Sequence, residues 1–275
     1  MTDIIAVTGG KGGTGKSTVA TALAYELSRK SSVLLVDADV DCPNDHLLLN
    51  IQRKELEIVY QRIPFIDQRK CTKCGKCGKV CKTKALISIK DRTPIFIQEQ
   101  CNGCGSCEIV CPEQAISWQK KEIGKLYKGS KDSLDLLSGE LKVNQPTSEF
   151  IVDHLNEEIR KKENNYGYII IDTAAGTHCP VIASFESAGK VIAVTEPTPL
   201  GVHDLEIILR LLKKINKHGT VIVNRSDVGD IQRVNDMTTK YDTRIIFKIP
   251  FSEEIVDSYS KGNPIMIKNI LEVLE

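Results

Sequence analysis

A glycine-rich loop between a short apolar strand and a helix is the feature that most constrains how this 275-residue chain can fold. Residues 3–8 (DIIAVT) form a β-branched run that is typical of a buried parallel strand. Residues 17–30 follow with the apolar spacing of a helix. The loop between them fits the phosphate-binding pattern G-x4-G-K-S through Gly10, Gly15, Lys16 and Ser17. Such glycines let backbone N–H groups surround phosphate oxygens at a helix N-terminus, which predicts a nucleotide site; a glycine-rich turn without a ligand is the alternative.

Two further apolar strands end in acidic residues. They lie within residues 32–41 (SVLLVDADVD) and 167–177 (GYIIIDTAAGT). Because the carboxyl ends of parallel strands meet at the ligand-binding edge of such a sheet, we expect these aspartates near a bound Mg²⁺. Lys16 is expected to contact the β- and γ-phosphates, and Ser17 to bind the Mg²⁺.

Strands and helices alternate along the rest of the chain. A charged helix is expected over 149–165, a basic amphipathic helix over 208–215 and a strand over 220–224. This alternation predicts an α/β fold with a doubly wound, mainly parallel sheet.

The charge and hydropathy of the chain bear on where it works and on the use of its cysteines. Lys and Arg (37) nearly balance Asp and Glu (36), and no apolar run reaches the roughly 20 residues of a membrane helix. We therefore expect a cytoplasmic protein that binds neither membranes nor nucleic acid. Since the cytosol keeps thiols reduced, the ten cysteines favour metal or redox chemistry over disulfides.

Eight of the ten cysteines form a duplicated pattern. Both runs have C-x2-C-x2-C-x3-C spacing, and the second follows the first at an offset of 30 residues. The first run contains Cys71, Cys74, Cys77 and Cys81, and the second contains Cys101, Cys104, Cys107 and Cys111. Over residues 66–118 this pattern resembles the bacterial-type ferredoxins, which carry two [4Fe–4S] clusters.

That resemblance implies which cysteines share a cluster, because the fourth cysteine of each run binds the other cluster in such ferredoxins. One cluster would be held by Cys71, Cys74, Cys77 and Cys111, and the other by Cys101, Cys104, Cys107 and Cys81. A pair of structural zinc sites is the alternative, although tetrahedral zinc needs no third cysteine two residues on. Lys82 departs from the ferredoxins, which usually have proline after the fourth cysteine, as Pro112 is in the second run.

Three motifs together resemble the MinD/ParA/Mrp class of P-loop ATPases, to which the nitrogenase iron protein also belongs. They are GKGGTGKST (10–18), DADVD (37–41) and DTAAGT (172–177). With the cysteine repeats, the chain resembles MinD-type ATPases that carry an inserted ferredoxin, a subgroup that VTEPTPLGVHDL (194–205) also matches. The resemblance implies a P-loop ATPase domain interrupted by a small α+β ferredoxin domain, with boundaries at 1–59, 60–121 and 122–275.

The same resemblance assigns roles to single residues. Lys11 is the signature lysine that reaches the partner's phosphates in a nucleotide-sandwich homodimer, and Asp39 orients or deprotonates the attacking water. Asp37 and Asp172 lie near Mg²⁺, usually through water. The implied catalytic residues are Lys11, Lys16 and Asp39, and the implied ATP or ADP contacts are Gly10, Gly12, Gly13, Thr14, Gly15, Lys16, Ser17, Thr18, Asn224 and Pro250.

Base recognition and function each leave alternatives. Asn224 is expected to read the purine and Pro250 to lie in a loop (248–254) over the base, but NRSD also resembles the guanine-reading N-K-x-D of GTPases.

One hypothesis is that ATP gates electron transfer from the clusters to a redox partner. The others are cluster assembly or carriage to an apo-protein, and a MinD/ParA-like organising switch. Cys179 is the candidate ligand of a further cluster, with Cys42 the only second cysteine near it, and a half-buried structural thiol is the alternative.

Overall fold

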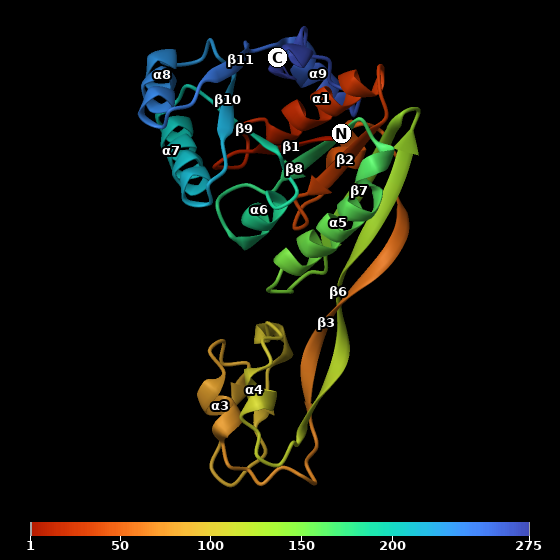
Figure 1. The fold of residues 1–275 in the computed structure, drawn as a ribbon, viewed down its shortest axis with the longest axis vertical. Coiled ribbons are helices and arrows are strands. Elements are labelled where there is room, and N and C mark those ends of the chain that lie inside the picture. The colour runs from red at the N-terminus through yellow and green to blue at the C-terminus, as the bar shows by residue number, and fades with distance from the viewer. Residues whose placement is uncertain (1, 275) are drawn as a thin grey trace.

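The computed structural model describes residues 2–274, within which nine strands form one sheet. Their order is β11-β10-β9-β1-β8-β2-β7-β6-β3 (Figure 1). The strands are β1 (Asp3–Thr8), β2 (Val33–Ala38), β3 (Lys54–Ile66), β6 (Ile116–Lys131), β7 (Leu134–Leu141), β8 (Tyr168–Thr173), β9 (Lys190–Thr195), β10 (Gly219–Asn224) and β11 (Ile245–Ile249). Neighbours from β11 to β7 pair in parallel, whereas β6 pairs antiparallel with both β7 and β3. The predicted mainly parallel α/β sheet is confirmed.

Helices cover both faces of the sheet, as a doubly wound fold requires. One face packs against α5 (Glu149–Lys162), α6 (Cys179–Ser184), α7 (Pro199–Lys214) and α8 (Ile231–Lys240). The other packs against α1 (Lys16–Ser28) and the short 3-10 helix η3 (Ile270–Leu274). The central strands are buried on both sides, which is why β2 and β8 are continuous apolar runs rather than alternating ones. Three further elements complete the ATPase-like body: α2 (Asp45–Leu48), η2 (Glu163–Asn165) and α9 (Glu253–Lys261).

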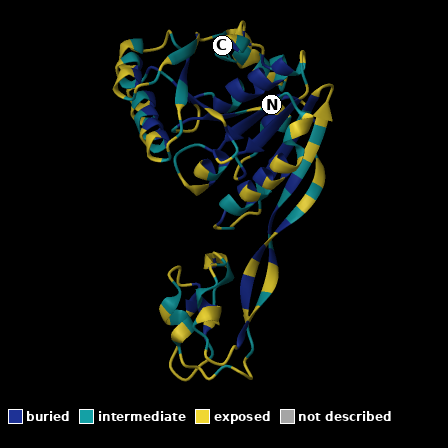
Figure 2. Cartoon of the chain, viewed as in Figure 1, coloured by how far each residue is buried: buried dark blue, intermediate teal, exposed yellow. Residues whose placement is uncertain are grey.

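The cysteine-rich segment lies at the far end of a long two-stranded ribbon (Figure 1). Strands β3 and β6 pair from Lys54–Lys128 to Ile66–Ile116, with two register shifts along the way. Beyond the ribbon, the segment folds into α3 (Lys76–Val80), α4 (Ser106–Ile109), η1 (Gln98–Gln100) and the hairpin of β4 (Leu86–Ile87) with β5 (Ile95–Phe96). Figure 2 shows that buried residues concentrate in the main sheet, while this segment is largely exposed.

Polar contacts fasten the cysteine-rich segment to the ribbon. Gln61 on β3 is buried and donates from Nε2 to the carbonyl oxygen of Cys101 at 2.9 Å. Lys121 on β6 is buried as well, and its Nζ donates to the carbonyl oxygen of Gln98 at 3.2 Å. Gly103 has a φ of +73°, and a Cβ there would lie 2.9 Å from the carbonyl oxygen of Arg62, so glycine permits this close approach. The segment is therefore positioned by the ribbon rather than only tethered to it.

Candidate functional site

The phosphate loop connects β1 to α1 with the backbone that anion binding needs. Gly15 caps α1 in the left-handed region (φ +91°), and a Cβ there would lie 2.3 Å from Nδ2 of Asn224. Gly12 and Gly13 are exposed, and a Cβ on either would meet no atom within 4 Å. Lys16 begins the helix and is 6% exposed. The loop thus presents open backbone and one buried cation at the N-terminus of α1, a favourable place for phosphate.

A cavity of about 510 Å³, partly open to solvent, adjoins this loop. Among the residues expected to contact nucleotide, those that line it are Gly12, Gly13, Gly15, Lys16, Ser17, Thr18, Asp39, Asn224 and Pro250. Gly10, Lys11 and Thr14 do not line it. The remaining wall comes from the loop after β11 and from α9, with Phe251 and Tyr259. These aromatic side chains are 49% and 54% exposed and give the cavity an apolar side suited to a base.

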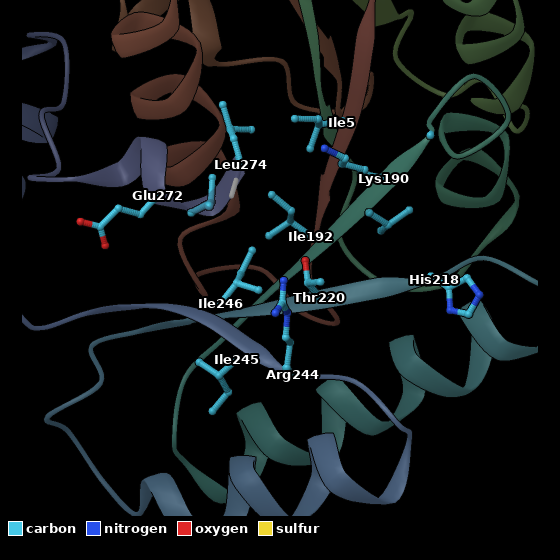
Figure 3. Close-up of a pocket in the computed structure, with 13 residues that line it drawn as sticks. Ile5, Lys190, Ile192, His218, Thr220, Arg244, Ile245, Ile246, Glu272 and Leu274 are labelled. Atoms are coloured by element: carbon cyan, nitrogen blue, oxygen red, sulfur yellow. The ribbon is translucent and has the colours of Figure 1, made fainter.

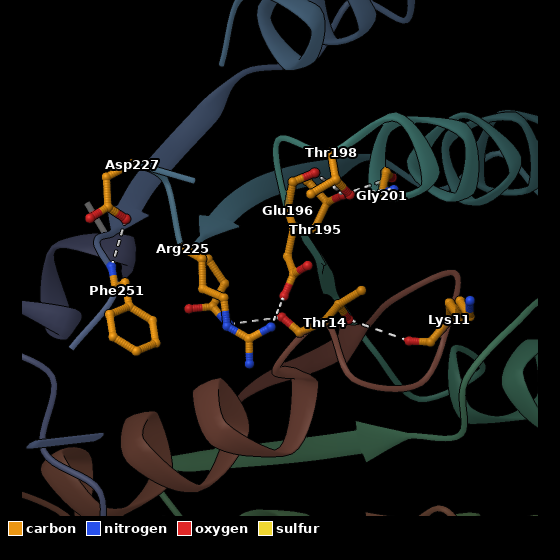
Figure 4. A network of polar contacts seen from close by, with 10 residues as sticks. Lys11, Thr14, Thr195, Glu196, Thr198, Gly201, Arg225, Asp227 and Phe251 are labelled. Carbon is orange, nitrogen blue, oxygen red and sulfur yellow. Dashed lines mark hydrogen bonds and ion pairs between the residues drawn. The ribbon is translucent and has the colours of Figure 1, made fainter. Parts of the chain in front are cut away.

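A polar network joins the phosphate loop to the segments after β9 and β10 (Figure 4). Asn224 donates from Nδ2 to the carbonyl oxygen of Thr14 at 3.0 Å, and the neighbouring Arg225 pairs with Glu196. Asp227 accepts from the backbone N–H of Phe251 at 2.7 Å, which ties the loop after β10 to the loop after β11. Asn224 therefore contacts the phosphate loop itself in addition to lining the cavity.

Three buried aspartates meet beneath the phosphate loop. Carboxylate oxygens of Asp37, Asp45 and Asp172 all lie within 4.8 Å of one another, and each side chain is at most 1% exposed. The backbone N–H of Asp45 donates to Asp37 at 3.1 Å. The carboxylate oxygens of Asp45 and Asp172 have no hydrogen-bond partner among the described residues. Buried carboxylates without donors fit a divalent cation, because Mg²⁺ prefers oxygen ligands.

Asp45 was not among the residues predicted from the sequence. It is the first residue of α2, eight positions after Asp37, and faces the two aspartates from a short helix rather than from a strand end. The sequence signal for Asp45 was an acidic residue two positions before the apolar run LLL (47–49).

The pKa values of these carboxyl groups reflect their crowding. Burial and the Asp172 charge raise the pKa of Asp37 to about 8. Burial raises the pKa of Asp172 to about 6, against the lowering effect of Lys16. Burial and both neighbouring aspartates raise the pKa of Asp45 well above its ordinary value. Burial likewise raises the pKa of Asp39, which is only half-buried, while Lys16 opposes the shift.

Replacing Asp45 with asparagine should stabilise the metal-free protein at pH 8 by about 1–3 kcal/mol and have little effect at about pH 3.5. A carboxyl group whose pKa is raised on folding contributes full stability below its unfolded pKa, near 3.8, and loses it as the pH rises towards the folded pKa. Urea unfolding at both pH values, with EDTA or with Mg²⁺, measures the effect. Mg²⁺ should stabilise the wild type at pH 8 much more than Asp45→Asn. An Asp45→Asn protein that is less stable than wild type at pH 8 in EDTA would contradict this account.

Lys11 lies outside the nucleotide cavity of its own chain. Its side chain is exposed, and it forms no ion pair within residues 2–274. Its carbonyl oxygen accepts from Oγ1 of Thr14 at 3.4 Å (Figure 4). The two loop lysines therefore differ: Lys16 is buried in the cavity wall, and Lys11 is free to contact something outside the chain.

A second large cavity lies at the amino ends of the parallel strands (Figure 3). Its lining includes Ile5, Lys190, Thr220 and Arg244, which stand near the amino ends of β1, β9, β10 and β11. Ligands of open parallel sheets bind outside the carboxyl ends of the strands. The nucleotide cavity lies at the carboxyl ends of the strands, whereas this second cavity lies at their amino ends.

The eight repeat cysteines line two smaller cavities in the segment beyond the ribbon. One is lined by Cys71, Cys74, Cys77 and Cys111. The other is lined by Cys81, Cys101, Cys104 and Cys107. Backbone N–H groups donate to sulfur at 3.3–3.4 Å, from Leu86 to Cys81, from Gly103 to Cys101 and from Ala115 to Cys111.

The cysteine sulfurs are not gathered as around a single metal ion. Within residues 2–274, no three of them lie mutually within 4.8 Å. Tetrahedral zinc with Zn–S bonds of about 2.3 Å would hold its sulfurs closer than this. Burial raises the pKa of Cys107 to about 11 and also raises those of Cys77 and Cys101, so burial favours the neutral thiol over the thiolate at these positions.

One of the two cysteines outside the repeats lies at the nucleotide site. Cys42 is exposed and lines the nucleotide cavity, and Cys179 is exposed at the start of α6. Neither belongs to a group of three close metal-binding side chains among the described residues. Their role as cluster ligands stays a prediction.

Comparison with known proteins identifies the family. The CobQ/CobB/MinD/ParA nucleotide binding domain matches residues 5–265. The uncharacterized protein MJ0579 of Methanocaldococcus jannaschii is 35% identical over 98% of this chain and 93% of its own length. The septum site-determining protein MinD of Synechocystis sp. is 27% identical over 99% of this chain and 85% of its own length. None of the helices described in residues 2–274 could span a membrane.

Solved structures agree on the fold. MinD of Pyrococcus horikoshii complexed with Mg-ADP superposes with a TM-score of 0.58 at 20% identity, over 96% of this chain and 87% of that one. A ParA family ATPase from Chlorobium tepidum superposes with a TM-score of 0.57 at 18% identity, over 99% and 93%. With its phosphate loop, its buried aspartates and this match over most of its length, the chain belongs to the CobQ/CobB/MinD/ParA nucleotide-binding family.

Proposed function

We propose that this protein is an ATPase whose nucleotide state gates electron transfer from two [4Fe–4S] clusters to a partner protein. ATP occupies the cavity beside the phosphate loop, with Lys16 on the β- and γ-phosphates. Ser17 holds a Mg²⁺ whose charge offsets that of the phosphates, and Asp37, Asp45 and Asp172 surround it directly or through water. Asp39 orients the attacking water, and its raised pKa brings it closer to that of a general base working near neutral pH.

Lys11 makes the nucleotide site dependent on a second copy of the chain. Its exposed side chain lies beside the loop but outside the cavity of its own chain. In a homodimer with two loops face to face, Lys11 reaches the partner's phosphates. ATP then favours the closed dimer, because only nucleotide supplies the negative charge that offsets two opposed lysines.

The residues 60–121 form the inserted ferredoxin module in this proposal. Cys71, Cys74, Cys77 and Cys111 hold one cluster, and Cys81, Cys101, Cys104 and Cys107 hold the other. Two observations fit these groups: four cysteines line each cavity, and backbone N–H groups donate to sulfur. When bound, the clusters supply one-electron redox chemistry.

The observation that carries the gating proposal is the continuity of the sheet between the two sites. Asp37 on β2 pairs in register with Ser138 on β7, and Ser138 pairs with Tyr127 on β6. Arg53 donates to Oγ of Ser138 at 3.0 Å and stacks over the Tyr127 ring at 4.6 Å. Strand β6 then continues as the ribbon that holds the cysteine-rich segment. A shift of the Asp37–Asp39 loop on nucleotide binding thus has a hydrogen-bonded route to the clusters.

Reduction of the reconstituted protein under anaerobic conditions tests this function. We expect ATP, but not ADP, to change the midpoint potential of a cluster, followed by electron paramagnetic resonance. Lys16→Ala should show no such change. Potentials that are identical with ATP, with ADP and without nucleotide would contradict gating.

Two other functions are distinguished by further outcomes. ATP-dependent transfer of ⁵⁵Fe to an apo-ferredoxin would identify a cluster carrier instead. The MinD relatives favour an organising switch, for which ATP hydrolysis and dimerisation would persist unchanged after both clusters are removed by Cys→Ser substitution.

The shared cysteine sets predict a specific pattern of iron loss. The wild type should bind about eight irons per chain. Cys71→Ser with Cys111→Ser removes two ligands of the same cluster and should leave about four irons. Cys81→Ser with Cys111→Ser removes one ligand of each and should leave close to none. Iron and sulfide analysis after reconstitution measures this, and Cys42→Ser is the control. Equal iron contents for the two double variants would contradict the assigned sets.

A further inference from the structure

We propose that electrons are exchanged through the first cluster, at a cationic groove that docks the acidic surface of a one-electron redox protein. This inference rests on the proposed function and adds to it the docking face and the chemical class of the partner. The groove lies beside the cysteine cavity of Cys71, Cys74, Cys77 and Cys111 and has a volume of about 540 Å³, open to solvent.

The charge of the groove is strongly positive. Its lining includes Lys73, Lys79, Lys84 and Lys90, with Asp91 as the one acidic side chain. All four lysines are exposed, and none of them forms an ion pair within residues 2–274. Residues 66–97 contain nine lysines or arginines and two aspartates, although the whole chain is nearly neutral at +1. Unpaired cations at this density attract an anionic partner over roughly one Debye length, about 10 Å at 0.1 M salt.

The lysines are not a requirement of the cysteine pattern. The second repeat has the same cysteine spacing, yet residues 98–118 contain three glutamates and no lysine or arginine. Duplication thus produced two similar cysteine runs with opposite charge. This difference in charge indicates that the lysines of the groove serve a function other than binding a cluster.

Two structural details make the groove suitable for electron exchange. Cys74 is exposed and lines both the first cysteine cavity and the groove, so a ligand of the first cluster forms part of the docking surface. Ile87 and Ile89 also line it and are 41% and 38% exposed. Apolar side chains ringed by charged ones are the usual anatomy of a protein interface. A docked partner would give one electron to the cluster or take one from it, and would itself be oxidised or reduced by that electron.

Stopped-flow electron transfer tests the groove with two probes of opposite charge. The acidic probe is a reduced plant-type [2Fe–2S] ferredoxin, and the basic probe is oxidised cytochrome c. The variant Lys79→Glu with Lys84→Glu reverses two charges in the groove. The control, Lys213→Glu with Lys214→Glu, makes the same change at exposed positions on α7 of the ATPase body.

With the acidic probe, we expect the groove variant to slow transfer at least tenfold at low salt, while the control matches wild type. With cytochrome c, the groove variant should be faster than wild type. High salt should remove both differences. Equal rates for groove variant and control would overturn the proposal.

Two measurements keep this test separate from that of the proposed function. Iron content and reduction by dithionite must match wild type in both variants, since failure there concerns the clusters and not the groove. The midpoint potentials must also match. A potential shift large enough to explain the slower transfer would overturn docking and make the lysines determinants of cluster potential.

Discussion

Replacing Lys16 with alanine should weaken ATP binding at least about 100-fold, because removing one partner of a buried charged contact costs about 2–5 kcal/mol. Lys16 is 6% exposed and is the one lysine among the described residues that lines the cavity, so its own chain offers no second lysine to the phosphates bound there. ATPase activity and the ATP-dependent change in cluster potential should disappear with binding. Isothermal titration calorimetry with Mg-ATP measures the affinity.

Two controls make this result specific. Lys30→Ala changes an exposed lysine just beyond the end of α1 and should bind ATP as wild type does. Lys16→Met keeps the length of the side chain without its charge, which separates loss of charge from loss of packing. Tight ATP binding by both Lys16 variants would exclude the assigned phosphate contact.

Replacing Lys11 with alanine should have a different effect: ATP binding within about threefold of wild type, but loss of ATP-dependent dimerisation and of nearly all hydrolysis. The reason is that Lys11 is exposed and outside the cavity of its own chain, whereas a contact made across a dimer is needed only when two chains close. Analytical ultracentrifugation with ATP and the nonhydrolysable analogue AMPPNP measures dimerisation, and phosphate release measures turnover.

A mixing experiment sharpens this prediction. In a dimer, each Lys11 contacts the nucleotide bound to the partner chain. In a heterodimer of the two variants, the Lys11→Ala chain keeps Lys16 and binds ATP. The Lys16→Ala chain supplies an intact Lys11 to that nucleotide. Mixing the two inactive proteins should restore part of the activity. Normal turnover by monomeric Lys11→Ala would be incompatible with the cross-dimer role.

In the proposed function, the sheet is the route by which a change at the phosphate loop would reach the cysteine-rich segment. Strand β2 leads into Asp37 and Asp39, β7 pairs with β2, and β6 carries the pairing on into the ribbon. Gln61 and Lys121 then fix the cysteine-rich segment to the ribbon through the backbone of Cys101 and Gln98. Each step is a backbone or buried polar contact, so the orientation of the cysteine-rich segment depends on how β6 pairs with the main sheet.

Features with short spacing along the chain could be predicted from the sequence. The loop from Gly10 to Thr18, the aspartates after β2 and on β8, and the repeated cysteines each depend on residues a few positions apart, where chain geometry is local. The expected strand at 3–8 matches β1, and the helix expected over 149–165 is divided into α5 and η2. Propensity and periodicity determined these features.

The features that could be found only from the tertiary structure depend on residues that are distant in sequence. Asp45 joins Asp37 and Asp172 because α2 turns back over the carboxyl ends of two strands, which no periodicity encodes. The β3–β6 ribbon depends on long-range pairing across the whole cysteine-rich segment. The cationic groove depends on the hairpin of β4 and β5, which brings Lys84 and Lys90 beside Lys73 and Lys79. The sequence alone thus determined which motifs this protein contains, and the tertiary structure decided how those motifs are joined, since contacts between distant segments arise only when the chain closes its loops.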